Sequence, residues 1–149
     1  MKTANKQRKD PYKKPEMVKE LESLADAEAR KLHPTCPALP PRKFRDDNSN
    51  NLTSCIVKYI TLNGGFESRI SNQGTYNQKP RKYIPGTSKR GLADIMATYN
   101  GLSLHLEIKH GADRQSEAQK KIESEVIRAG GLYYLARDFS SFKSWLDNI

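Results

Sequence analysis

The chain has 149 residues, enough for one domain with a single hydrophobic core. Its 26 lysines and arginines outnumber its 17 aspartates and glutamates, and the net charge of +9 favours a polyanionic partner, most often nucleic acid. No stretch approaches the roughly 20 apolar residues of a membrane span, and Cys36 and Cys55 fit neither a disulfide scaffold nor a zinc motif. We therefore expect a soluble cytoplasmic protein that is not exported and has no membrane partner.

The first 48 residues are predicted to be an accessory region. Residues 1–15 are basic and have no apolar pattern, as in a disordered arm. From Pro15 to about Leu32, apolar residues recur at helical spacing and predict an amphipathic helix. The prolines and basic residues between His33 and Asn50 are typical of a linker without regular structure. We expect the main domain to span residues 49–149.

A helix, a short strand and a long basic loop are predicted next. Residues near 51–62 carry apolar side chains on one side of a helix, and residues 66–70 alternate as in a strand. The segment 71–90 has no acidic residue and places tyrosines among its cations. Such a loop can hold phosphates and stack on bases, or it can be a solvated loop without function. The residues that would hold phosphates are Lys79, Arg81, Lys82, Lys89 and Arg90.

Residues 91–109 are predicted to form a β-hairpin. Asn100-Gly101 is the dipeptide most typical of a two-residue type I′ turn, and this turn pairs Tyr99 with Leu102. The register of the turn fixes every later pair, and side chains alternate between the two faces of a strand. One face is therefore wholly apolar and expected to be buried; it consists of Ala93, Ile95, Ala97, Leu104, Leu106 and Ile108.

The other face of this hairpin brings two carboxylates together. The register places Asp94 directly opposite Glu107, with Lys109 two residues further along. Like charges in this position cost stability, and a divalent cation held by the two carboxylates and water would offset that cost. The lysine would then orient a water or stabilise charge on a phosphate. The alternative is that these three side chains are simply solvated on an exposed strand.

A crossover is predicted to complete the sheet. Residues 116–129 have helical spacing, 132–136 form a short apolar strand that we expect to be central, and Asp138 caps a last helix. A strand–helix–strand connection of this kind joins two parallel strands. The predicted fold class is therefore α/β (α+β): a mixed four-stranded sheet flanked by helices, in the order α-β-β-β-α-β-α after the accessory helix.

Three segments of this sequence resemble a known family. They are Gly91-x-x-Asp94, then Glu107-Ile108-Lys109, then the run 113–119 (DRQSEAQ) before a helix that ends at Ala129-Gly130-Gly131. Together they resemble the VRR-NUC branch of the PD-(D/E)xK nucleases, above all its small stand-alone phage and prophage members. The resemblance covers about residues 50–149. It implies a restriction-endonuclease-like core that hydrolyses phosphodiester bonds in DNA with Mg²⁺ or Mn²⁺.

The resemblance also implies roles for individual residues. Asp94 and Glu107 would be metal ligands, together with the backbone carbonyl of Ile108. Lys109 would assist the attacking water or the transition state. The family's helix glutamine, which faces the active site, corresponds to Gln119.

Other positions admit two interpretations. Ser116-x-x-Gln119 is also a capping box, in which the glutamine only reaches back to the start of its helix. Arg69 and Asn72 resemble an Arg-x-x-Asn segment of the same family, and the resemblance implies that they contact the substrate backbone. Many family members carry a glutamate in the first core helix, where this chain has Asn51. That residue either replaces the glutamate as a neutral ligand or marks the loss of the position.

These patterns favour a metal-dependent endonuclease acting on branched or structured DNA, such as a four-way junction or a flap. A homodimer would suit paired cuts, and residues 1–48 would grip the substrate or mediate self-association. A nucleic-acid-binding protein on the same fold, without turnover, is the alternative. A third interpretation, an interaction module with no role on nucleic acid, predicts negligible DNA affinity that does not depend on salt.

Overall fold

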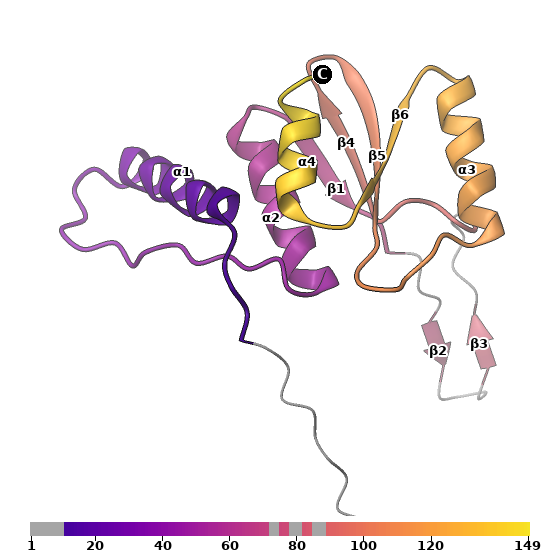
Figure 1. Cartoon of the computed structure of the whole chain (residues 1–149), viewed down its shortest axis with the longest axis horizontal. Coiled ribbons are helices and arrows are strands. Elements are labelled where there is room, and N and C mark those ends of the chain that lie inside the picture. The colour runs from indigo at the N-terminus through magenta and orange to yellow at the C-terminus, as the bar shows by residue number, and fades with distance from the viewer. Residues whose placement is uncertain (1–10, 72–74, 78–81, 85–88) are drawn as a thin grey trace, which may run out of the picture.

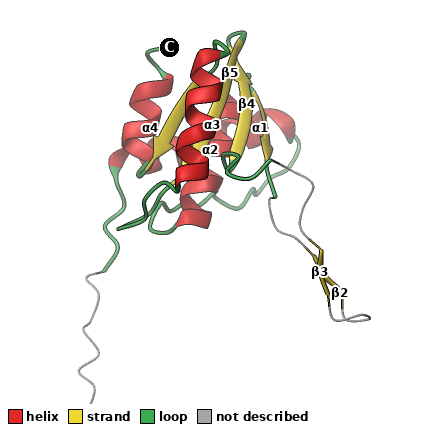
Figure 2. Ribbon diagram, turned by 90° about the vertical axis from the view of Figure 1, so that its right-hand side faces the viewer, coloured by secondary structure: helices red, strands yellow, loops and turns green. Residues whose placement is uncertain are grey.

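The computed structural model describes residues 11–71, 75–77, 82–84 and 89–149. Its elements are α1 (Glu16–Leu32), α2 (Ser49–Leu62), β1 (Phe66–Arg69), β2 (Thr75–Asn77), β3 (Lys82–Ile84), β4 (Ile95–Tyr99), β5 (Leu102–Ile108), α3 (Glu117–Arg128), β6 (Leu132–Ala136) and α4 (Phe139–Leu146). A four-stranded sheet has the order β1-β4-β5-β6, with α2 and α4 on one face and α3 on the other (Figure 1 and Figure 2). The predicted α/β class with a mixed sheet is confirmed.

The β4–β5 hairpin has the predicted register. Tyr99 pairs with Leu102, and the antiparallel ladder continues to the pair of Ile95 with Leu106. Asn100 and Gly101 have φ angles of 49° and 78°, as a type I′ turn requires. All members of the predicted apolar face are buried: Ala93, Ile95, Ala97, Leu104, Leu106 and Ile108.

The crossover from β5 through α3 to β6 produces a parallel pair, as predicted. The expectation that β6 is central is wrong, because β6 pairs only with β5 and forms an edge of the sheet. Both α3 and α4 contact this strand. An edge strand covered by helices on its two faces has the continuous apolar sequence of an internal strand.

The segment predicted to be a basic loop contains a second, small sheet. Strands β2 and β3 pair antiparallel, with Tyr76 opposite Tyr83. Strands of three residues are too short to show a periodic pattern, so the sequence indicated only a loop here. The four-stranded sheet and its helices keep the predicted order α-β-β-β-α-β-α.

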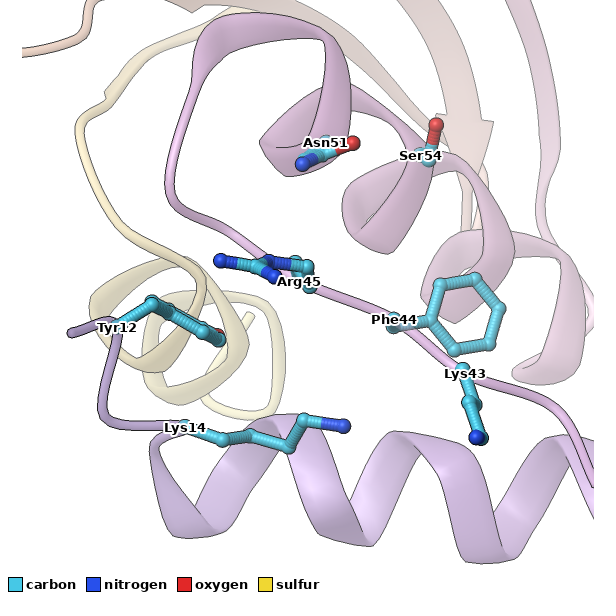
Figure 3. A pocket seen from close by; sticks show the side chains of 7 residues that line it. All are labelled: Tyr12, Lys14, Lys43, Phe44, Arg45, Asn51 and Ser54. Carbon is cyan, nitrogen blue, oxygen red and sulfur yellow. The ribbon is translucent and has the colours of Figure 1, made fainter.

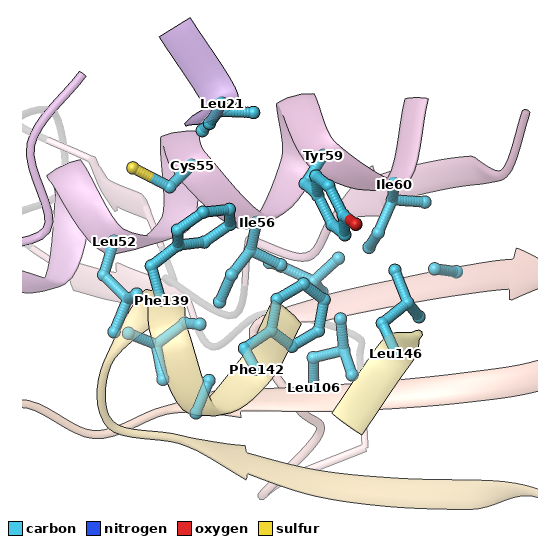
Figure 4. Close-up of a cluster of buried hydrophobic side chains, with 14 of the residues drawn as sticks. Leu21, Leu52, Cys55, Ile56, Tyr59, Ile60, Leu106, Phe139, Phe142 and Leu146 are labelled. Carbon is cyan, nitrogen blue, oxygen red and sulfur yellow. The ribbon is translucent and has the colours of Figure 1, made fainter. Parts of the chain in front are cut away.

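One hydrophobic core lies between the sheet and helices α2 and α4 (Figure 4). Val18 and Leu21 of α1 belong to the same core and are fully buried. Residues before position 49 therefore contribute to the packing of the domain predicted to span residues 49–149. The largest fully buried side chains of the core include Leu21, Leu52, Ile56, Ile60, Leu106, Phe139, Phe142 and Leu146.

The segment between α1 and α2 has no helix or strand and is held against α1 by hydrogen bonds. The backbone N–H groups of Arg42 and Phe44 donate to the carboxylates of Asp26 and Glu22, each at 2.7 Å. Acidic side chains of α1 thus satisfy the backbone of a proline-rich segment that cannot form a ladder. The predicted basic arm falls largely on residues 1–10, outside the described residues. No helix in the described part of the chain is long and apolar enough to cross a bilayer.

Candidate functional site

A cavity of about 390 Å³ lies where the start of α2, the ends of β1 and β5, the approach to β4 and the start of α3 meet. Six of the residues predicted for the site line this cavity. The fold thus brings together positions up to 50 residues apart in sequence. Those six are Arg69, Asp94, Glu107, Ile108, Lys109 and Gln119. Ile70, Ser49, Asn50 and Thr53 complete the wall.

Asp94 reaches this cavity by a route that differs from the prediction. The β4–β5 ladder ends at Ile95, so Asp94 is not paired across the strands with Glu107. Instead its Oδ2 accepts a hydrogen bond of 2.8 Å from the backbone N–H of Ile108. A regular ladder would have offered that N–H the carbonyl of Ala93. The aspartate carboxylate thus takes the place of a backbone acceptor and lies at the end of β5.

Glu107 is a buried carboxylate with one satisfied and one unsatisfied oxygen. Only 2% of the residue is exposed. Its Oε1 accepts from Gln119 Nε2 at 2.5 Å and lies 3.0 Å from Lys109 Nζ. Its Oε2 is buried without a hydrogen-bond partner among the described residues. Burial raises the pKa of Glu107, Asp94 adds to this, and Lys109 and Gln119 oppose it.

These donors fit a divalent cation. The unpartnered Oε2 of Glu107 needs a positive or hydrogen-bonding neighbour, because a buried carboxylate oxygen without one is costly. Asp94 and the end of β5 at Ile108 line the same cavity. No group of three or more histidine, cysteine, aspartate or glutamate side chains that could hold a metal occurs within the described ranges. Two carboxylates supplemented by a carbonyl and water are nevertheless an ordinary ligand set for Mg²⁺.

Gln119 completes the predicted capping box and also contacts Glu107. Its Oε1 accepts from the backbone N–H of Ser116 at 2.9 Å, which completes the capping box at the start of α3. Its Nε2 donates to Glu107 Oε1. A side-chain amide carries both an acceptor and donors, so one residue can cap the helix and orient a buried carboxylate.

The two roles of Gln119 can be separated by substitution. We expect Gln119→Glu to preserve the capping box, since glutamate suits that position, but to set a second carboxylate against Glu107. The metal-dependent cleavage expected from the sequence should then fall about 10-fold or more. We expect Ser116→Ala to lower the unfolding free energy by about 1 kcal/mol and to leave cleavage nearly unchanged. Thermal melts and initial cleavage rates of both variants check this. Equal losses of activity in the two variants would contradict it.

Gly91 allows the chain to pass close to the start of α3 just before Asp94. Its φ is +88°, and a Cβ at this position would lie 2.6 Å from the carbonyl carbon of Ala118 and 2.9 Å from the backbone nitrogen of Gln119. A side chain is therefore excluded both by the backbone conformation and by space. The spacing Gly91-x-x-Asp94 thus fixes the aspartate relative to the helix that carries Gln119.

Lys89 and Arg90, two of the residues predicted to hold phosphates, lie outside the cavity of the two acids. Lys89 and Arg90 are exposed, and Lys89 pairs with Glu125 of α3 at 3.1 Å and lines a different cavity. Among the predicted substrate contacts whose side chains the structure describes, Arg69 alone lines the cavity of the two acids. The side chains of Asn72, Lys79, Arg81 and Lys82 lie outside what the structure describes.

Asn51 does not line the cavity of the two acids. Its Nδ2 donates to Asp47 Oδ1 at 2.7 Å. It lines a separate cavity of about 420 Å³, shown in Figure 3, with Tyr12, Lys14, Lys43, Phe44, Arg45 and Ser54. Asn51 is therefore not placed to act as a neutral ligand beside Asp94 and Glu107.

Three residues at the start of α2 were missed as part of the site. Ser49, Asn50 and Thr53 line the cavity of the acids, and Thr53 Oγ1 donates to the carbonyl of Ser49 at 2.7 Å. Their spacing places them on one side of a helix, which was the available signal. No family model, curated protein or solved structure matches the chain. The function is therefore inferred from the geometry of the site and from the resemblance of its motifs.

Proposed function

We propose that the protein is a divalent-metal-dependent deoxyribonuclease of PD-(D/E)xK type, of the VRR-NUC branch. One observation carries this proposal: Asp94, Glu107 and Lys109 converge in one cavity, and the buried Oε2 of Glu107 has no partner among the described residues. A structural ion pair alone would not account for that oxygen, because Lys109 and Gln119 both bind the other one. A cation does account for it.

Each residue has a distinct role in the proposed reaction. Asp94, Glu107 and the carbonyl of Ile108 would hold Mg²⁺ or Mn²⁺. When bound, the metal supplies charge stabilisation at the phosphate and a lowered pKa for a water nucleophile. Lys109, with a side chain only 12% exposed, provides a fixed positive charge for the transition state. Gln119 would orient Glu107, and Arg69, which lines the same cavity, would contact a phosphate.

The proposed substrate is branched or structured DNA, such as a four-way junction or a flap. The net charge of +9 supports a nucleic-acid partner, and the preference for branches rests on the family resemblance. A homodimer making paired cuts belongs to the same proposal. A protein that binds nucleic acid without turnover is the competing function, and it is separated from a nuclease by the experiment below.

The proposal is tested by incubating wild type and Asp94→Ala with labelled linear, flap and junction DNA, in EDTA, Mg²⁺ or Mn²⁺. We expect cleavage by the wild type only with metal, and a loss of at least about 100-fold in Asp94→Ala. Asp113→Ala is the matched control, because this aspartate is exposed and lies outside the cavity. Salt-sensitive binding without products from any variant would indicate a non-catalytic DNA-binding protein. Negligible, salt-insensitive affinity would contradict both functions.

A further inference from the structure

Three buried side-chain polar atoms lack a hydrogen-bond partner in the described part of the structure: His105 Nδ1, Glu107 Oε2 and Tyr133 Oη. Strands β5 and β6 run parallel, and Tyr133 is the register partner of His105. His105 and Glu107 are two residues apart, so all three side chains project from the same face of the sheet. This face is the one covered by α3 (Figure 2). The three atoms therefore belong to one buried polar region beneath α3.

The chemistry of these atoms favours a link between Tyr133 and Glu107. An ionised carboxylate only accepts hydrogen bonds, so Oε2 needs a donor. Burial raises the pKa of the Tyr133 hydroxyl to about 12, the charge of Glu107 acts in the same direction, and the neighbouring Gln115 side chain opposes it. The phenol therefore keeps its proton at neutral pH. His105 is placed differently, because it also lines the cavity beside α3 near the hairpin turn, and its Nε2 lies 3.5 Å from Ser103 Oγ.

We propose that Tyr133 is a positioning residue for Glu107, and that its hydroxyl is linked to Glu107 Oε2 through one buried water. Buried polar groups that lack protein partners are generally satisfied by internal water. The inference rests on the proposed function, because it assigns Tyr133 the task of orienting a cation ligand. A carboxylate oxygen can accept a hydrogen bond and still bind a cation, since it has two lone pairs. Hydrogen bonds of this kind typically contribute 10–100-fold to metal affinity.

The test compares Mn²⁺ binding to metal-free wild type, Tyr133→Phe and Tyr134→Phe by calorimetric titration. Tyr134 is the matched control: it projects from the opposite face of β6 and stacks on Trp145, with ring centroids 4.4 Å apart. Both substitutions delete one hydroxyl from neighbouring tyrosines. We expect Tyr133→Phe to weaken Mn²⁺ binding about 10–100-fold and Tyr134→Phe to change it less than about 2-fold. Thermal melts of the three proteins show whether the effect is separate from folding.

Equal Mn²⁺ affinity of wild type and Tyr133→Phe would overturn the inference. A metal-free crystal structure of the wild type that resolves ordered water is the second measurement. This crystal structure tests the link between Tyr133 and Glu107 even if Tyr133→Phe does not fold or the wild type binds no Mn²⁺. A wild type that binds no Mn²⁺ would refute the proposed function but not this link. A water within hydrogen-bond distance of both Tyr133 Oη and Glu107 Oε2 supports the inference. A Tyr133 hydroxyl bonded to His105 instead, or no water between the two groups, overturns it.

Discussion

Glu107→Gln is expected to abolish the proposed metal-dependent cleavage and, at the same time, to raise the thermal stability of the metal-free protein. Activity should fall at least about 1,000-fold, because the substitution removes a charged ligand from a site with only two carboxylates. The unfolding free energy should rise by about 1 kcal/mol, a shift of roughly 2–4 °C in the melting temperature.

The stability gain follows from the buried charge. The fold raises the pKa of Glu107, so folding favours the protonated carboxyl. The stability that this group contributes is complete below its pKa in the unfolded chain and is lost as the pH rises through its pKa in the folded protein. A neutral glutamine keeps that contribution at pH 7. The same substitution removes a buried carboxylate oxygen that accepts no hydrogen bond from any described residue.

Melting curves with and without Mn²⁺ measure both effects of Glu107→Gln. Mn²⁺ should raise the melting temperature of the wild type and leave that of the variant unchanged, because only the wild type keeps both proposed carboxylate ligands. Glu117→Gln is the matched control, since Glu117 is exposed at the start of α3, with 89% of its side chain accessible. A metal-free variant that is less stable than the wild type would contradict the argument from buried charge.

Gly91→Ala is expected to cost about 3 kcal/mol of unfolding free energy and about 100-fold in cleavage. A positive φ accounts for about 1 kcal/mol, and the new Cβ would lie 2.6 Å from the carbonyl carbon of Ala118. The backbone at Gly91 and the backbone at Ala118 must therefore move apart. The movement separates Asp94 from Gln119, and misplacement of site residues by about 1 Å can reduce catalysis on the order of 100-fold.

Gly101→Ala is the control that isolates the clash. Gly101 has a comparable φ of +78°, but nothing lies within 4 Å of a Cβ there. This variant should lose about 1 kcal/mol through backbone strain alone and keep its cleavage rate. Chemical denaturation and initial rates give the comparison. If both glycine variants lose the same stability, the close approach of Gly91 to α3 is not what holds the site together.

Local signals in the sequence were sufficient to predict most of the fold. The Asn100-Gly101 turn determined the hairpin register and therefore the buried face. Asp138 caps α4 as predicted, by accepting from the N–H of Ser141. The sequence did not reveal how elements of similar apolar composition are arranged relative to one another in space. Strand β6 is apolar because α3 and α4 cover it, and α1 joins the core through Val18 and Leu21 across a segment without periodicity.

The candidate site shows the same division. The pairing of carboxylates was inferred from a continued ladder, yet the ladder ends at Ile95 and Asp94 binds the N–H of Ile108 with its side chain. Sequence periodicity cannot show where a ladder stops. Gln119 was given two competing roles because a pattern does not reveal that the two ends of one amide serve different partners.

The hydrogen bond from Ile108 to Asp94 makes an acidic side chain part of the backbone pairing that terminates the sheet. Folding of the sheet and assembly of the candidate site are consequently a single event in this protein. Opening of that strand end would release the Asp94 carboxylate together with the Ile108 amide, so a loosened sheet would also disrupt the candidate site. Asp94 cannot move independently of the sheet, because its carboxylate accepts the backbone hydrogen bond at the end of β5.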